Sequence, residues 1–178
     1  MPNESTIIFG IEIPSTSPTF LTVVGFHIAV GLAAVVAGMM AMFSKKGRGR
    51  HSAFGEVYFW LLLMIFVSAT FLAAMRWAED YHLFILGSLS FATACLGRTA
   101  VWLRLRNWVK LHIVGMGTSY VLMLTAFYVD NGKMLPIWKE LPPIAYWLLP
   151  GAVGIPLIAR ALLGHPLARN PSQPAVDG

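Results

Sequence analysis

Five histidines are the residues of this sequence with the most distinctive chemistry. His27, His51, His82 and His112 each stand in or next to a different long apolar stretch, and His165 lies near the C-terminal end. Histidine is the commonest imidazole ligand for metal ions and for haem iron. An ionisable side chain in a membrane span is costly and therefore indicates a functional site. The first four histidines are our candidate ligands for haem iron or another metal; His165 receives no role.

The composition places the chain among membrane proteins. Of its 178 residues, 57% are hydrophobic and only 12% are charged, whereas globular chains carry about 25% charged residues. The net charge of +5 fits basic residues gathered in membrane loops, so we expect no nucleic-acid partner. A single cysteine, Cys95, excludes a disulfide within one chain. The common motifs of soluble enzymes are absent, so no catalytic residue is assigned and enzymatic activity is left open.

Five apolar stretches are long enough to cross a lipid bilayer as helices. A helix rises about 1.5 Å per residue, so about 20 apolar residues span the hydrocarbon core. We predict spans over residues 20–43, 54–75, 83–102, 111–129 and 144–163. The fifth contains Pro150 and Pro156, which favour a kink. Residues 1–19 are expected to form an irregular lead-in, and residues 164–178 a loose tail.

Short connections join the first four spans, and such connections favour antiparallel neighbours. The sequence therefore predicts an all-α, polytopic transmembrane bundle: a four-helix up-down core with a fifth, kinked helix, in one transmembrane domain over residues 20–163.

Basic residues are unevenly distributed between the two sides of this predicted bundle. Ten of the thirteen Lys and Arg fall on the side of the first connection, the third connection and the C-terminus. The other side carries Arg76, Lys133 and Lys139. Because Lys and Arg are enriched in cytoplasmic loops, we expect the N-terminus outside and the C-terminus in the cytoplasm.

This topology sorts the four histidines into an outer pair, His27 with His82, and an inner pair, His51 with His112. Residues three or four apart share a helix face, and a small residue beside a histidine makes room for a porphyrin. The same small residues also line ordinary contacts between membrane helices. The glycines in question are Gly31, Gly55 and Gly115. The inner pair fits a shared iron better, because His27 is expected deep in its span and His82 barely submerged.

Several motifs resemble a family of small bacterial predicted membrane proteins of unknown function. The matching residues are His27 with Gly31 and Gly38, Arg50 and His51 with Gly55 and Tyr58, and His112 with Ser119, Tyr120 and Thr125 to Phe127. The resemblance covers roughly residues 20–131. It implies the helical topology and a bacterial inner (cytoplasmic) membrane, with no established activity. A more distant likeness, of arrangement alone, is to the transmembrane di-haem cytochromes b, and it implies haem b as cofactor.

The first functional hypothesis is electron transfer. One or two b-type haems, or a metal, would be held by His51 with His112 and by His27 with His82, and quinone is an expected exchange partner. The alternative is a non-catalytic accessory or assembly subunit of a larger membrane complex. It rests on the irregular fifth helix, the small size and a group of methionines at positions 39, 40 and 42. A permease ranks below both, because only Glu56 and Arg98 offer a polar path.

Overall fold

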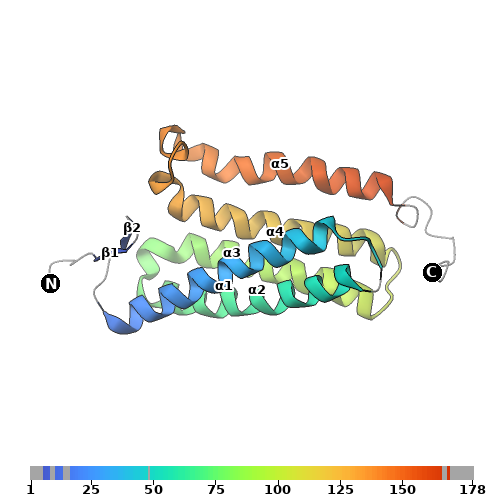
Figure 1. Cartoon of the computed structure of the whole chain (residues 1–178), viewed down its shortest axis with the longest axis horizontal. Coiled ribbons are helices and arrows are strands. Elements are labelled where there is room, and N and C mark those ends of the chain that lie inside the picture. The colour runs from blue at the N-terminus through green and yellow to red at the C-terminus, as the bar shows by residue number, and fades with distance from the viewer. Residues whose placement is uncertain (1–5, 9–10, 14–16, 48, 166–167, 169–178) are drawn as a thin grey trace. The chain divides into compact units, whose positions relative to one another are not determined.

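The computed structural model describes residues 6–8, 11–13, 17–47, 49–165 and 168 (Figure 1). In this part of the chain, five helices are long and apolar enough to cross a membrane. They are α1 (Pro18–Phe43), α2 (Arg50–Met75), α3 (Trp77–Trp102), α4 (Trp108–Asn131) and α5 (Pro143–Gly164). The protein is thus an all-helical, multi-pass membrane protein, as its composition predicts.

The helices begin earlier than the predicted spans, most clearly at α2 and α3. Helix α2 begins at Arg50 rather than at residue 54, and α3 begins at Trp77 rather than at residue 83. Hydropathy marks only the part of a helix that lies in hydrocarbon, whereas the backbone hydrogen bonds continue into the interface. As a result, His51 belongs to the first turn of α2 and His82 lies inside α3.

Short elements occupy the N-terminal lead-in and the connection between α4 and α5. The strands β1 (Thr6–Ile8) and β2 (Ile11–Ile13) pair antiparallel within the lead-in that was expected to be irregular. The 3₁₀ helices η1 (Gly132–Met134) and η2 (Trp138–Glu140) lie between α4 and α5. Most of the tail, which was expected to be loose, falls outside the described residues.

The chain divides into two compact units, Met1–Ile85 and Leu86–Gly178. In the first unit, α1 and α2 lie side by side and antiparallel (Figure 1). The start of α3 belongs to this unit too, and Phe84 stacks on Phe66 of α2 with ring centroids 6.4 Å apart. Buried side chains of this unit include Ala34 and Leu62.

In the second unit, the backbones of α3 and α4 approach each other closely at two glycines. A Cβ added at Gly115 would lie 2.7 Å from the backbone nitrogen of Gly97 and 2.7 Å from the carbonyl oxygen of Thr93. Nearby, the hydroxyl of Ser90 donates to the backbone oxygen of Ser119 at 2.8 Å, and both serines are buried. Small residues thus permit a close contact between antiparallel membrane helices.

Helices α4 and α5 pack through two reciprocal notches. Ile158 of α5 lies over Gly117 of α4, where an added Cβ would come within 2.6 Å of its Cγ1. Val121 of α4 lies over Gly154 of α5, where an added Cβ would overlap its Cγ2. Each helix therefore supplies one glycine and one β-branched side chain, four positions apart. The two prolines expected to kink the fifth span lie inside α5, which continues through both as a helix.

Replacing Gly115 by Ala should destabilise the protein, because the added methyl group meets backbone atoms of α3 that can move only with their helix. We expect a loss of about 1–3 kcal/mol in the free energy of unfolding, the usual cost of overpacking. Chemical unfolding of the purified protein in detergent measures this loss. Gly55→Ala is the matched control, since a Cβ there meets no described atom within 4 Å. Equal stability of the two variants would contradict the close approach.

Candidate functional site

His51 donates a hydrogen bond to the end of the preceding helix. Its Nδ1 lies 2.8 Å from the backbone oxygen of Ala41, in the last turn of α1. A carbonyl oxygen only accepts, so Nδ1 carries the proton of the neutral ring. The lone pair of that imidazole is therefore on Nε2.

Lys46 binds the same helix end as His51. Its ammonium donates to the carbonyl oxygen of Met42 and, at 3.4 Å, to that of Ala41. The last carbonyls of a helix have no partner within the helix and carry a partial negative charge. Two basic side chains from the following segment thus satisfy the C-terminal end of α1. Burial lowers the pKa of the Lys46 ammonium.

His112 repeats this arrangement in the second unit. Its Nδ1 lies 3.2 Å from the backbone oxygen of Gly97, on the preceding helix α3. The acceptor is again a carbonyl oxygen, so the proton is on Nδ1 and the lone pair on Nε2. In each unit, a histidine near the start of one helix therefore donates to a carbonyl of the helix before it.

His27 is oriented by a serine in place of a backbone carbonyl. Its Nδ1 lies 2.8 Å from the hydroxyl oxygen of Ser68, a buried residue of α2. The hydroxyl donates its one hydrogen to a backbone oxygen of its own helix, with Met64 at 2.8 Å and Ile65 at 3.0 Å. With the hydroxyl hydrogen on either of these carbonyls, Ser68 accepts from His27, and Nδ1 of His27 then carries the proton.

The three histidines therefore share one tautomer. In His27, His51 and His112 the protonated Nδ1 is held by an oxygen acceptor, and the lone pair is on Nε2. A hydrogen bond of this kind fixes the orientation of a metal-binding imidazole and raises the basicity of its other nitrogen. Such a ring can ligate a metal ion or haem iron through Nε2, or accept a proton there. This donor set fits the predicted ligands.

The space beside these histidines differs from one helix to the next. A Cβ built at Gly31 or at Gly55 meets no atom of the described residues within 4 Å. Each of these glycines lies one helical turn after its histidine, His27 or His51. The space expected beside Gly115 is filled by the backbone of α3, so the prediction of a cofactor groove there is wrong: the glycine serves a helix contact instead.

His82 has a more polar neighbourhood than the other three. Its ring makes an edge contact with Tyr81 at a centroid distance of 5.7 Å, and it interacts electrostatically with Asp80. One turn earlier, Arg76 forms an ion pair with Glu79 at 3.2 Å. His82 lies in the first turns of α3, and the charged groups around it are typical of a membrane interface.

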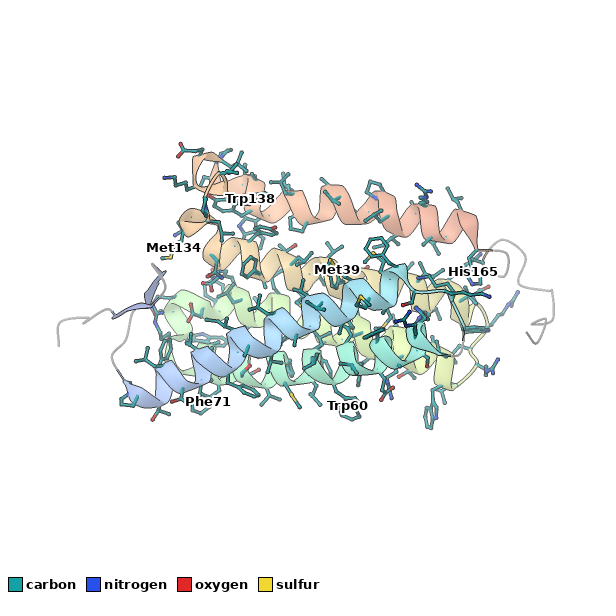
Figure 2. The ribbon with its side chains drawn as sticks, viewed as in Figure 1. Met39, Trp60, Phe71, Met134, Trp138 and His165 are labelled. Atoms are coloured by element: carbon teal, nitrogen blue, oxygen red, sulfur yellow. The ribbon has the colours of Figure 1, made fainter. Side chains whose placement is uncertain are left out.

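His165 follows α5 and is separate from the four candidate ligands. Figure 2 shows it at the C-terminal end of α5, with Trp138 at the opposite end. Its Nδ1 is buried and has no hydrogen-bond partner within the described ranges.

In the first unit, Trp60 is half exposed and projects outward from α2 (Figure 2), and its ring nitrogen donates to Glu56 at 2.7 Å.

The structure joins each of three candidate histidines to an oxygen acceptor on a neighbouring helix. Among the described residues, no group of three or more His, Cys, Asp and Glu side chains is placed to hold a metal ion. A closed structural metal site, which needs about four protein ligands, is therefore absent from this part of the chain. The pairing of His27 with His82 and of His51 with His112 stays a prediction.

Sequence reasoning missed the acceptors of these hydrogen bonds. Ser68 stands 41 residues from His27, and no spacing rule connects them. The available signal was weak: a serine in an otherwise apolar span, which frequently bonds across helices. Backbone acceptors such as Ala41 give no signal at all, because every residue carries a carbonyl group.

Residues 24–161 match the model of a protein family described as "Predicted membrane protein (DUF2306)". The chain belongs to this family. The matched region covers well over half of the 178 residues and confirms the resemblance to a family of predicted membrane proteins of unknown function. All four candidate histidines lie inside the DUF2306 region, and His165 lies outside it. No curated protein and no solved structure matches the chain, so these comparisons give the cytochrome b likeness no support.

Replacing Lys46 by Met should weaken the end of α1, because two backbone carbonyls lose a charged donor. We expect a loss of about 0.3–1 kcal/mol, the usual contribution of a cation at a helix C-terminus. Thermal unfolding in a neutral detergent measures it. Lys45→Met is the matched control: the same residue type stands next in the chain, with no hydrogen bond to the helix end in the described structure. An equal loss in both variants would contradict the proposed cap.

Proposed function

We propose that this family member binds b-type haem, or a metal ion in its place, through histidine imidazoles and transfers electrons in the membrane. The ligands are His51 and His112, with His27 and His82 as a second pair. The observation that carries the proposal is the shared tautomer of three of these residues. Each holds its Nδ1 proton on an oxygen acceptor and has its lone pair on Nε2.

The protein's contribution is to orient the rings. The carbonyls of Ala41 and Gly97 fix the ring planes of His51 and His112, and the hydroxyl of Ser68 fixes that of His27. A haem iron, when bound, supplies reversible one-electron exchange.

The distribution of Lys and Arg supports one orientation of the protein in the membrane. The connections between α1 and α2 and between α3 and α4, taken with the adjoining helix ends, carry eight of the thirteen Lys and Arg, which favours the cytoplasmic side. We therefore place the protein in a bacterial inner membrane with its N-terminus outside. Quinone, which is dissolved in the same bilayer, is the proposed exchange partner.

The test is the absorption spectrum of the detergent-purified protein, reduced with dithionite minus oxidised in air. We expect sharp haem bands in near-stoichiometric amount. His51→Ala and His112→Ala should each remove most of the signal of the inner site, because an iron with one axial ligand loses its bis-histidine spectrum. His165→Ala is the matched control and should leave the spectrum unchanged.

A flat difference spectrum of the wild-type protein, together with no bound metal by elemental analysis, would overturn the proposal. Full haem content in the His51→Ala and His112→Ala variants would instead remove these two residues as ligands. Metal without haem would keep the histidines as ligands and replace the cofactor.

A second candidate function, an accessory or assembly subunit of a larger membrane complex, rests on α5. Only two of its residues are buried, Tyr146 and Pro150. Apart from Arg160, its exposed large side chains are apolar, namely Ile144, Trp147, Leu148, Val153, Ile155, Leu157 and Leu163. A helix with so little internal contact suits a protein whose outer helix packs on a partner within the membrane.

The accessory function predicts that the protein purifies from its native membrane, in mild detergent, within a larger assembly and without a chromophore. Native gel electrophoresis followed by mass spectrometry measures this. Val153→Trp, on the exposed surface of α5, should release the protein from that assembly because it changes the shape of the contact. Purification as a single coloured chain would contradict the accessory function.

A further inference from the structure

The segment between α1 and α2 concentrates positive charge at one membrane surface. We call residues 44–50 the basic loop; it contains Lys45, Lys46, Arg48 and Arg50. In the structure Lys45, Lys46 and Arg50 are exposed, and Arg48 lies outside the described residues. The basic loop thus presents several cations within a few residues.

These cations are not balanced by carboxylates of the chain. The basic loop contains no acidic residue, and neither does the first turn of α2. Lys46 donates to the end of α1. For Lys45 and Arg50, the described part of the molecule holds no ion pair. Their charge is therefore available to an anion from outside the chain.

The apolar surface next to the basic loop indicates the depth of the loop relative to the bilayer. Phe43, the last residue of α1, is 83% exposed, and Met42 is exposed as well. Large apolar side chains at the end of a membrane helix mark the boundary between hydrocarbon and headgroups. Lys45 follows Phe43 by two residues and is therefore expected close to this boundary, on the headgroup side.

Two glycines let the backbone turn sharply within this short segment. Gly47 and Gly49 have φ angles of 114° and 116°, which side-chain-bearing residues rarely adopt. The chain can thus reverse direction between two antiparallel helices and keep Lys45 at one end of the turn and Arg50 at the other.

We propose that the basic loop binds the phosphate of an anionic phospholipid headgroup, with Lys45 and Arg50 as the binding cations. Clusters of Lys and Arg directly beside a membrane span attract anionic lipids. The exposed apolar end of α1 favours a lipid over a free phosphate, because acyl chains cover Phe43 while the headgroup meets the loop. The proposal is independent of haem or metal binding.

The connection between α3 and α4 is a less suitable site, although it is also basic. Its Arg104 guanidinium lies 5.7 Å from the ring centroid of Trp108, in a cation–π contact within the chain. This contact holds the Arg104 side chain against its own segment of the chain. Lys45 and Arg50 make no such ring contact within the described residues, so the basic loop is the site that we propose.

The experiment is a thermal-stability titration of the full-length, delipidated protein in neutral detergent. Dioleoylphosphatidylglycerol should raise the melting temperature, whereas dioleoylphosphatidylcholine at the same concentration should not. In the double variant Lys45→Gln, Arg50→Gln, the apparent affinity for phosphatidylglycerol should fall by up to about fivefold for each cation removed. The charge-retaining variant Lys45→Arg, Arg50→Lys should respond like the wild type, which separates charge from misfolding.

Two further arms make the outcome decisive. Lys133→Gln with Lys139→Gln, two exposed cations on the opposite side of the predicted topology, should leave the lipid response unchanged. Inorganic phosphate at the same concentration should produce no stabilisation. An unchanged phosphatidylglycerol response in the Lys45, Arg50 double variant would overturn the proposal, as would equal stabilisation by phosphatidylcholine. Equal stabilisation by inorganic phosphate would replace the lipid with a soluble anion.

Discussion

A polar group of the backbone that has no partner is expensive in a membrane, and this constraint is visible throughout the structure. Within each helix the hydrogen-bond ladder meets it, but the ends of helices need help from outside. At the end of α1, Lys46 and His51 bind the last carbonyls. On α3, His112 adds a second donor to the carbonyl of Gly97. The imidazoles that are candidates for a cofactor thus also connect consecutive helices.

A histidine that connects two helices through Nδ1 can also serve as a ligand through Nε2. Nδ1 binds the neighbouring helix, and the hydrogen bond decides the tautomer, so the lone pair is always on Nε2. The hydrogen bond at Nδ1 does not compete with ligation, which would use Nε2. It also holds the ring in one orientation. His27 differs in that its acceptor is the hydroxyl of Ser68 and not a backbone carbonyl.

The helices were predictable from sequence, and the contacts between them were not. Long apolar stretches identified all five helices, although the polar first turns of α2 and α3 escaped, since Arg50 and Glu79 read as loop residues. The histidines were found by their type and position. Their acceptors, Ser68 and Ala41, depend on how two helices are aligned, which hydropathy does not encode. The glycine pattern was ambiguous in the same way: Gly55 leaves space, whereas Gly115 meets another backbone.

The paired notches of α4 and α5 have a consequence for movement. Ile158 sits over Gly117 and Val121 over Gly154, so a shift of one helix along the other would drive a branched side chain out of its notch and against a larger residue. Sliding is thereby opposed in both directions. Tyr146 adds a third contact, because its ring covers Gly132 and its hydroxyl donates to the backbone oxygen of Trp138 at 3.1 Å. Any displacement of α4 during function should therefore carry α5 with it as one rigid body.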